Sequence, residues 1–338
     1  STINQLMTAM VIFVGVHLVF SGGLSAGILV GFNMLAGRVS RPIIDLVTLK
    51  TEVTKLVQSL QIVSGIVDAN SETSVRGQKP QLMGQINFKK VEFSYDDETK
   101  ILKEVDLDIA PRQIVGITGK SGCGKSTMAK LIQGLYRPQS GLVGLDNIDL
   151  RLLDLSHIRS QVSLVSAESY FFPGTIRENI SRPMPNSSMD RITWATKKVF
   201  AHEEIESFPD AYETFLEENA SNISTGLRQK FAIARALIRN PRILILDDAM
   251  SGFDVDSEIK LYDGLPDIAL GRTVIIVSNR LYHLRLCNKI FVLDNGKISQ
   301  QGSFENLKNE PGFFGETYNK QTSILGGSPV NKVLKKAV

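Results

Sequence analysis

Two apolar runs stand near the beginning of the chain. Leu6 to Phe20 spans 15 residues and Leu24 to Gly37 spans 14, each with only two polar side chains. A helix needs about 20 apolar residues to cross the hydrocarbon of a bilayer, so either run alone could equally be a buried core helix. Their pairing favours the membrane, because the connection Ser21–Gly23 carries no charge and basic residues follow the second run, which places both ends in the cytosol. These basic residues are Arg38, Arg41, Lys50 and Lys55.

A polar stretch with regularly spaced apolar positions comes next. Between Thr48 and Ala69 the apolar residues recur close to helical spacing, which predicts an amphipathic helix. The segment Asn70–Met83 is rich in Ser, Gly, Gln and Pro, and its composition predicts a linker. A cleaved secretory signal is not expected, because no charged n-region precedes the first apolar run.

The rest of the chain combines short aliphatic runs with helical patterns. Ile114–Thr118, Ile243–Leu246 and Thr273–Ser278 have the composition of strands that are buried on both faces, as in parallel sheets. Helical patterns follow the first run at Thr127–Leu135 and precede the second at Phe231–Leu237. We therefore expect an α/β domain with buried parallel strands.

Composition agrees with one large domain and an appendage. The chain has 338 residues, and 43% of them are hydrophobic, which can supply a substantial core. The net charge of +3 is too small to argue for nucleic-acid binding. Cys123 and Cys287 show neither metal-ligand nor disulfide-framework spacing, so we expect the main domain to lie in a reducing cytosol.

The run Gly119-Lys-Ser-Gly-Cys-Gly-Lys-Ser126 is the most specific chemical feature of the chain. Glycines let the backbone turn so that its N–H groups face phosphate oxygens, and the following helix adds its positive end. Lys125 can place a charge between the outer phosphates, and the Ser126 hydroxyl can ligate Mg²⁺. Cys123 lies within this electropositive loop, next to Lys125, and is expected to react with a thiol reagent faster than Cys287. The alternative is a glycine-rich turn without a ligand.

Two further segments indicate which kind of phosphate-binding protein this is. Asp247 and Asp248 end the aliphatic run at Leu246, and strand ends of this kind face the ligand crevice of an α/β sheet. Upstream, Asn222-Ile-Ser-Thr-Gly-Leu-Arg-Gln-Lys230 leads into a helical pattern. Together with the phosphate loop, these segments resemble the nucleotide-binding domain of ATP-binding cassette (ABC) transporters.

The resemblance implies a fold class and a division into domains. The fold class is an α/β P-loop NTPase, with a RecA-like mixed sheet and a helical subdomain, plus N-terminal transmembrane helices. The segment Ser21–Gly37 is similar to the last two membrane helices of haemolysin-type exporters of type I secretion, so we expect the chain to begin inside a longer protein. The expected parts are the end of a transmembrane domain with its cytosolic helical extension at 1–70, a linker at 71–83, an ABC nucleotide-binding domain at 84–320 and a basic tail at 321–338.

The resemblance also assigns nucleotide and metal contacts. Tyr95 matches the aromatic residue that stacks on adenine in the family, although a lone Tyr beside a strand is usually a core residue. Asp247 and Ser126 are expected to hold Mg²⁺, the carboxylate usually through water. The expected ATP contacts are Tyr95, Gly119, Ser121, Gly122, Cys123, Gly124, Lys125, Ser126, Thr127, Ser224, Gly226 and Asp254.

Three catalytic positions depart from the family pattern. Asp248 stands where a glutamate positions or activates the attacking water in the family. Its side chain is one methylene shorter, and withdrawal of the carboxylate by about 1 Å can cost on the order of a hundredfold in rate. Asn279 replaces the histidine that faces the γ-phosphate. Ala167 replaces the glutamine that senses Mg²⁺ and links to the membrane domain. His283 is expected to be an ordinary exposed side chain rather than a substitute for the missing histidine.

The signature, Leu-Ser-Gly-Gly-Gln in the family, is a fourth departure and reads Ile223-Ser-Thr-Gly-Leu227 here. Ser224 remains a good helix N-cap and a hydroxyl donor, and Gly226 still permits a close backbone approach. Thr225 is expected to crowd the nucleotide of a partner domain, and Leu227 cannot make the polar contacts of the glutamine. Since each nucleotide site is completed by the partner's signature, neither a homodimer nor a heterodimer restores a full site.

Three classes of function follow from these features. The first is an ATP-binding subunit of an exporter that uses ATP and Mg²⁺, with slow hydrolysis, to move a protein or peptide across the bacterial inner membrane, its nucleotide domain lying in the cytoplasm. The second is a hydrolysis-deficient pseudo-ATPase half of a heteromeric transporter. The third, a soluble P-loop ATPase, is disfavoured by the apolar start of the chain. The implied partners are a second ABC subunit in a homodimer or heterodimer, the membrane, a periplasmic adaptor and an outer-membrane channel, with no nucleic acid.

Overall fold

The computed structural model describes residues 2–67, 77–96 and 99–324. Within it the chain divides into two compact units, Ser1–Thr73 and Ser74–Val338. Much of the expected linker at 71–83 and most of the expected basic tail at 321–338 fall outside the described residues.

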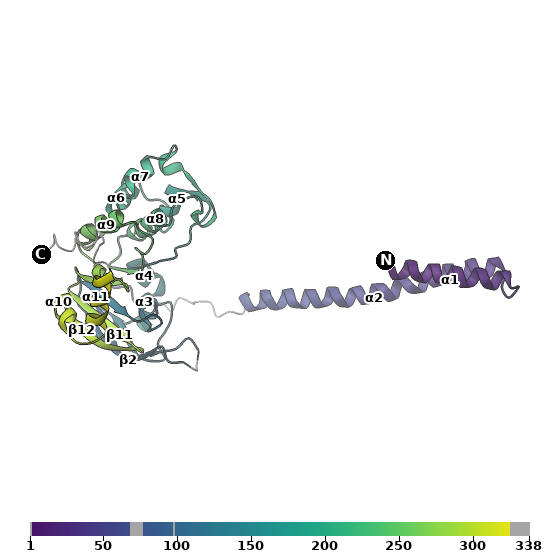
Figure 1. Cartoon of the computed structure of the whole chain (residues 1–338), viewed down its shortest axis with the longest axis horizontal. Coiled ribbons are helices and arrows are strands. Elements are labelled where there is room, and N and C mark those ends of the chain that lie inside the picture. The colour runs from purple at the N-terminus through teal and green to yellow at the C-terminus, as the bar shows by residue number, and fades with distance from the viewer. Residues whose placement is uncertain (1, 68–76, 97–98, 325–338) are drawn as a thin grey trace. The chain divides into compact units, whose positions relative to one another are not determined.

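The first unit is a pair of helices (Figure 1), α1 (Thr2–Phe20) and α2 (Ala26–Val67). The left-handed backbone of Gly22, with φ 80°, ends α1, and the N–H of the next residue donates to Leu18 O at 3.0 Å. A Cβ atom at Gly15 would lie 2.0 Å from Leu29 Cδ1, so glycine allows α1 and α2 to touch.

Most of the described apolar side chains of this unit are exposed. Phe13 and Phe20 are 79% and 87% exposed. In the part of the chain that the structure describes, no helix is both long enough and apolar enough to cross a membrane. The side chain of Arg38 is exposed, and that of Arg41 is not among the described ones.

A six-stranded mixed sheet is the centre of the second unit, with the spatial order β12-β11-β3-β10-β9-β6. Its strands are β3 (Ile114–Gly119), β6 (Val162–Ser166), β9 (Ile243–Asp247), β10 (Thr273–Val277), β11 (Lys289–Asp294) and β12 (Lys297–Gly302). All neighbours are parallel except the edge pair β11 and β12. Every residue of β10 is buried, which explains its continuous aliphatic sequence.

One face of this sheet packs on a second, antiparallel sheet of order β2-β1-β4-β5. Those strands are β1 (Ile86–Phe93), β2 (Leu102–Ile109), β4 (Ser140–Leu145) and β5 (Ile148–Asp149). Two helices share this core, α3 (Lys125–Ile132) and α4 (Leu155–Gln161). Ile117 and Ile245 of the central sheet join Phe88 and Met128 in it, all four 2% exposed or less.

The other face packs on a group of helices that includes α8 (Thr225–Leu237), α9 (Val255–Ile268), α10 (Phe304–Asn309) and α11 (Phe313–Ile324). Leu246 and Ile276 of the sheet share this core with Phe231 and Phe314. The four-residue 3₁₀ helix Leu281–Leu284 follows β10 and contributes two of its leucines.

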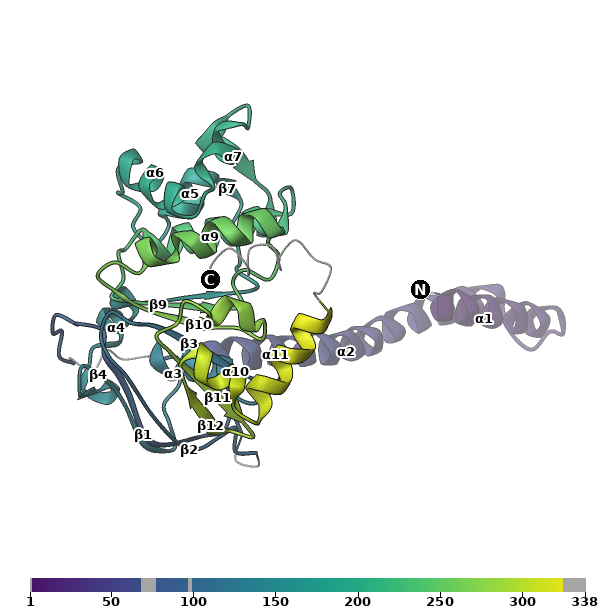
Figure 2. The ribbon, with the colours of Figure 1, turned by 60° about the vertical axis from the view of Figure 1, so that its left-hand side comes forward.

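Three short helices and a small strand pair form one end of the unit, where Figure 2 shows α5, α6 and α7 grouped away from β1 and β2. These elements are α5 (Ile176–Ser181), α6 (Met189–Lys198), α7 (His202–Glu206), β7 (Gly174–Thr175) and β8 (Phe215–Leu216). Further 3₁₀ turns lie at Leu150–Leu152, Ala211–Glu213 and Glu218–Ala220. A capping box between Thr175 and Glu178 begins α5.

Candidate functional site

Four loops leave the same edge of the central sheet side by side. In the parallel ladder Ser166 pairs with Asp247, Asp247 pairs with Val277, and Val277 pairs with Ile117. Because parallel strands end at one edge, the residues that follow β6, β9, β10 and β3 are neighbours in that order. The loops contain Ala167, Asp248, Asn279 and the phosphate loop after Gly119. The structure therefore brings three of the four departures from the family pattern to the phosphate-loop edge.

Glycines shape the phosphate loop. Gly119, Gly122 and Gly124 have φ values of 143°, 77° and 106°, in the region that favours glycine. A Cβ atom at Gly119 would lie 2.1 Å from Leu293 O, and one at Gly124 would lie 2.7 Å from Leu102 Cδ2. Side chains are therefore excluded from both ends of the loop, by backbone conformation and by space.

Lys125 lies at the start of α3 and is buried. Its Nζ donates to Gly119 O and to Lys120 O, both at 2.9 Å, so the ammonium group is held across the loop. The N-cap of α3 is Gly124, which has no side chain, so the first N–H groups of the helix make no hydrogen bond to a capping side chain. A buried cation and a helix N-terminus next to a tight glycine loop can bind phosphate. The Cys123 Sγ lies 3.9 Å from Lys125 Nζ.

Asp247 ends β9 beside the phosphate loop. Burial raises the pKa of its carboxyl group, the neighbouring Asp248 raises it further, and a hydrogen bond from Ser126 together with Lys125 opposes the rise. The hydroxyl of Ser126 and the Asp247 carboxylate thus lie next to each other. One carboxylate and one hydroxyl suit Mg²⁺, which takes most of its other ligands from phosphates and water. Among the described residues, no cluster of three or more His, Cys, Asp or Glu side chains forms a protein-only cage.

Asp248 adopts a left-handed backbone conformation with φ 48°. Its N–H donates to Val277 O at 3.0 Å, and its carbonyl accepts from Ser251 N at 3.1 Å. Aspartate is one of the few residues with a side chain that adopts this conformation at modest cost. The main chain at Asp248 is therefore tied both to β10 and to the loop that leads to α9.

Tyr95, shortly after β1, is 49% exposed and so is not a core residue. Its ring makes edge contacts with Phe93 and Tyr136, at centroid separations of 5.0 and 5.1 Å. The Tyr95 Oη lies 3.2 Å from Thr127 Oγ1 in α3, and Lys130 Nζ lies 5.6 Å from the ring centroid. The ring is thus fixed beside the phosphate-loop helix and remains partly accessible to a base.

Ser224 caps α8, where its hydroxyl accepts from Leu227 N at 3.2 Å. Leu227 is only 5% exposed, and its apolar side chain packs in the core. Thr225 is exposed, and its Oγ1 accepts from Arg228 Nη2 at 3.0 Å. A Cβ atom at Gly226 would lie 3.1 Å from the carbonyl oxygen of Gly252, so the start of α8 lies close to the loop before α9.

Asp254 caps α9, and its Oδ1 accepts from Ser257 N at 2.8 Å. The hydrogen bonds from Ser257 lower the pKa of this carboxyl group. Between described residues, no hydrogen bond or ion pair joins Ser224, Gly226 or Asp254 to the phosphate loop. The structure brings Tyr95, the phosphate loop and Asp247 together. Ser224, Gly226 and Asp254 lie elsewhere, at the starts of α8 and α9.

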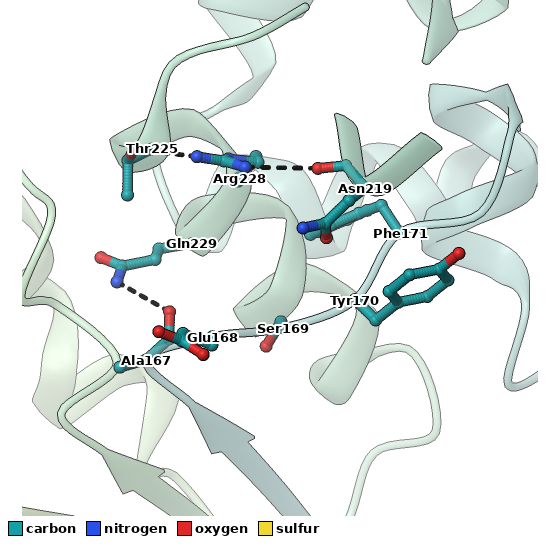
Figure 3. A pocket seen from close by; sticks show the side chains of 9 residues that line it. All are labelled: Ala167, Glu168, Ser169, Tyr170, Phe171, Asn219, Thr225, Arg228 and Gln229. Atoms are coloured by element: carbon teal, nitrogen blue, oxygen red, sulfur yellow. Dashed lines mark hydrogen bonds between the residues drawn. The ribbon is translucent and has the colours of Figure 1, made fainter. Parts of the chain in front are cut away.

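Gln229 is a residue whose role the sequence pattern does not indicate. It lies on α8 beside a pocket of about 570 Å³ (Figure 3). The Gln229 Nε2 donates to Ala167 O and to Ser251 Oγ, both at 3.1 Å, and Gly252 N donates to Gln229 Oε1 at 2.9 Å. An amide in a helix whose buried residues are otherwise apolar except for Lys230 is the one feature that could have marked it. The pocket is lined by Ala167, Glu168, Ser169, Tyr170, Phe171, Asn219, Thr225, Arg228 and Gln229.

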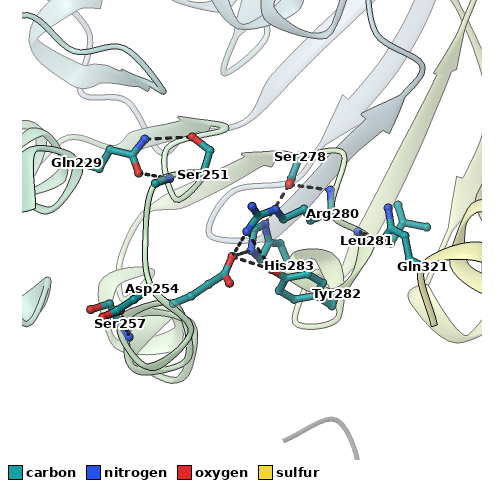
Figure 4. A network of polar contacts seen from close by, with 12 residues as sticks. Gln229, Ser251, Asp254, Ser257, Ser278, Arg280, Leu281, Tyr282, His283 and Gln321 are labelled. Atoms are coloured by element: carbon teal, nitrogen blue, oxygen red, sulfur yellow. Dashed lines mark hydrogen bonds and ion pairs between the residues drawn. The ribbon is translucent and has the colours of Figure 1, made fainter. Parts of the chain in front are cut away.

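The expectation that His283 is exposed is wrong. Its side chain is 3% exposed and makes hydrogen bonds with Glu258 and Ser278. Figure 4 shows His283 and Ser278 within this network of polar contacts. His283 lies in the 3₁₀ helix after β10, and its two ring nitrogens contact Glu258 on α9 and Ser278 directly after β10. His283 is therefore a buried hydrogen-bonded residue.

The glycine loop that leads into a helix, the buried lysine and the acid that ends the neighbouring strand define a P-loop nucleotide-binding protein. Residues 102–251 match the ABC transporter family, and the chain carries a domain of that family. The resemblance noted in the sequence is thereby confirmed.

The relatives of the chain include proteins that are named for the export or translocation of toxins. It is 36% identical to the leukotoxin export ATP-binding protein LtxB of Aggregatibacter actinomycetemcomitans, over 92% of this chain and 45% of the relative. It is 38% identical to the alpha-hemolysin translocation ATP-binding protein HlyB of Escherichia coli, over 90% of this chain and 44% of the relative. The chain therefore spans less than half the length of these curated relatives.

A solved structure has the same fold. The chain is similar to a bacterial Atm1-family ABC exporter with ATP bound, with a TM-score of 0.75 and 28% sequence identity. The match covers 89% of this chain and 53% of that exporter.

Proposed function

We propose that the chain is the ATP-binding part of an ABC exporter of type I secretion, which couples ATP binding and hydrolysis to the transport of a protein or peptide. The observation that carries this proposal is the phosphate loop with its buried Lys125, in a chain that is similar over nine-tenths of its length to toxin exporters. Their names describe the export of leukotoxin and the translocation of alpha-hemolysin, and a related role here is an inference from that similarity.

The proposed roles follow from the positions of the side chains. Tyr95 stacks on the adenine, the loop Gly119–Thr127 binds the phosphates, and Lys125 neutralises their charge. Asp247 and Ser126 hold Mg²⁺, which supplies charge neutralisation at the phosphates when it is bound. Asp248 orients the attacking water, and Asn279 donates a hydrogen bond to the outer phosphate. Ser224, Gly226 and Asp254 serve the site from a second subunit.

Membrane attachment and assembly are part of the same proposal. The two helices of the first unit expose many large apolar side chains, and in this proposal those side chains face lipid or other helices of the transporter. The subunit pairs with a second ABC subunit, in the inner membrane of a bacterium and with its nucleotide domain in the cytoplasm. A periplasmic adaptor and an outer-membrane channel complete the export path.

Hydrolysis is proposed to be slow. Asp248 has a shorter reach than glutamate, Ala167 has no side chain to sense the metal, and Asn279 has no titratable group. The comparisons do not support the alternative of a pseudo-ATPase, which would bind ATP without turnover. Measurement of steady-state ATP hydrolysis beside ATP affinity separates the two.

The experiment that tests the proposal is a titration of the purified chain with a fluorescent ATP analogue and Mg²⁺. Lys125→Ala should weaken binding at least about tenfold, because it removes the cation that faces the phosphates. Lys198→Ala is the control, since it removes a lysine that is paired with Asp267 in the helical part of the unit. Equal affinity of the wild type and the Lys125 variant would reject the proposed nucleotide site.

A further inference from the structure

A buried carboxylate accepts hydrogen bonds from several residues that follow β10. Glu258 on α9 has a side chain that is 7% exposed. Its Oε1 accepts from Arg280 Nη1 at 3.0 Å, from Tyr282 Oη at 2.8 Å and from His283 Nε2 (Figure 4). All three donors come from the five residues after Ser278, so this part of the chain is tied to α9 through one oxygen atom.

The imidazole of His283 extends this contact back toward the sheet. Its Nδ1 lies 3.0 Å from Ser278 Oγ, which also accepts from Arg280 N at 3.1 Å. If Nε2 carries the proton toward Glu258, Nδ1 accepts from the serine hydroxyl, and both ring nitrogens of His283 have a partner. Burial favours the neutral form of Glu258, but hydrogen bonds from His283 and Tyr282 and the charge of Arg280 prevail and lower the pKa of this carboxyl group.

A second contact holds the same segment from the other side. The Gln321 side chain on α11 donates from Nε2 to Asn279 O at 2.8 Å, and its Oε1 accepts from Leu281 N at 3.0 Å. Ser278 N donates to Ile117 O of β3 at 3.1 Å. The main chain on both sides of Asn279 is therefore fixed, while the Asn279 side chain itself is exposed at the phosphate-loop edge.

We propose that His283 is a positioning residue for Asn279, because with Glu258 and Ser278 it ties the segment that carries Asn279 to α9. Helix α9 begins at Val255, directly after its N-cap Asp254, at the end of the loop that follows Asp248. The link thus fixes the two loops that present Asp248 and Asn279 relative to each other. An amide reaches less far than an imidazole, so a site with Asn279 depends more on this fixed placement. The inference rests on the proposed ATP hydrolysis.

The test compares the ATP turnover of the 338-residue chain and its variants. His283→Ala should lower kcat about tenfold and leave KM within about twofold, because the phosphate loop is untouched. His283→Gln should recover part of the loss, since its amide can donate to Glu258 but cannot also reach Ser278. His202→Ala is the matched control, because His202 Nδ1 lies 2.9 Å from Tyr212 Oη in the helical part of the unit. This variant should lose stability but keep its kcat.

A double-mutant cycle distinguishes positioning from a general structural role. If His283 acts through Asn279, the variant Asn279→Ala/His283→Ala should turn over no more slowly than Asn279→Ala alone, although its melting temperature falls further. Losses in kcat that multiply in the double variant would overturn the proposal.

Hydrogen exchange gives an outcome that does not depend on turnover. In His283→Ala, peptides that cover residues 278–284 should exchange faster than in the wild type, with MgATP affinity unchanged. Unchanged exchange in these peptides would overturn the inference. Absence of hydrolysis in the wild type would instead overturn the proposed function, and the exchange experiment would still decide whether His283 holds the segment.

Discussion

The side-chain amide of Gln229 donates a hydrogen bond to the main-chain oxygen of Ala167 at 3.1 Å. The two residues lie 62 positions apart, on α8 and directly after β6. The same side chain bonds to Ser251 and Gly252, in the loop that leads from β9 to α9. One buried amide therefore holds together three segments, two of which leave the phosphate-loop edge of the sheet. At Ala167 the side chain cannot interact with a nucleotide, but the main chain is held in place.

Replacement of Gln229 by Ala should lower the free energy of unfolding by about 2 to 3 kcal/mol, because it leaves buried polar groups without partners. Gln139 is a matched control, since its side chain also makes three hydrogen bonds, all to Ser94, but is exposed. Gln139→Ala should cost about 1 kcal/mol or less, because water replaces the lost bonds. Urea unfolding of the two variants measures the difference. Equal losses would mean that the Gln229 contacts do not stabilise the fold more than surface contacts do.

The charge of Asp247 should destabilise the protein in the absence of nucleotide. Burial raises the pKa of this carboxyl group in the folded state above its unfolded value, so its contribution is favourable at low pH and is lost as the pH rises through the folded pKa. Asp247→Asn should therefore raise the melting temperature at pH 7, and the gain should shrink toward pH 4. The same substitution should abolish the extra stability that Mg²⁺ adds in the presence of ATP.

Asp254 supplies a control, because the pKa of its carboxyl group is shifted in the opposite direction. Its folded pKa is lowered by Ser257, so its carboxylate stabilises the protein above the unfolded pKa, and that stability is lost as the pH falls through the folded pKa. Asp254→Asn should give no gain at pH 7. A gain in both variants would show that charge removal in general, rather than burial of Asp247, is responsible. Thermal unfolding between pH 4 and pH 8 measures both effects.

Most of the phosphate-loop edge could be predicted because its elements are local in sequence. The run before Gly119 and the run before Asp247 are each apolar throughout, as strands buried on both faces must be. The predicted helix Thr127–Leu135 is α3, which begins two residues earlier at Lys125 and ends at Ile132, because the left-handed Gly134 terminates it. Helix boundaries depend on such backbone conformations more than on apolar spacing.

The contacts of Gln229 and His283 could not be predicted in the same way. Each depends on a partner brought close by the fold, with separations of 62 residues for Ala167 and 25 for Glu258. A histidine four residues after Asn279, in a segment that also contains Arg280 and Tyr282, has the composition of an exposed turn. The sequence does not show that Glu258 on α9 faces this turn and supplies the carboxylate that makes burial of the imidazole favourable.

Restoring the family side chains should raise ATP turnover. The triple variant Asp248→Glu, Ala167→Gln and Asn279→His should hydrolyse ATP at least about tenfold faster, if placement of the attacking water limits the rate. The left-handed backbone of Asp248 suits aspartate better than glutamate, so the variant should also melt at a lower temperature. Phosphate release under saturating MgATP measures the rate, with Asp248→Asn as the inactive control. No gain in rate would indicate that the segment Ile223–Leu227, rather than the three replaced residues, limits ATP turnover.

The two cysteines should differ in their reactivity toward a maleimide. Both are 7% exposed. Cys287 lies between the sheet and the helices, and burial raises the pKa of its thiol, so little thiolate forms there. The Cys123 Sγ lies 3.9 Å from Lys125 Nζ, inside the phosphate loop. Cys123 should therefore react faster than Cys287, and bound MgATP should protect it.

Peptide mapping after limited labelling, with Cys287→Ser as the single-cysteine control, measures the rate at Cys123 alone. The adduct should also prevent ATP binding, because the loop has little spare space: a Cβ atom on Gly119 would already lie 3.0 Å from the Cys123 Sγ. Labelling of Cys123 at the same rate with and without saturating MgATP would show that nucleotide does not occupy this loop or that the thiol points away from it.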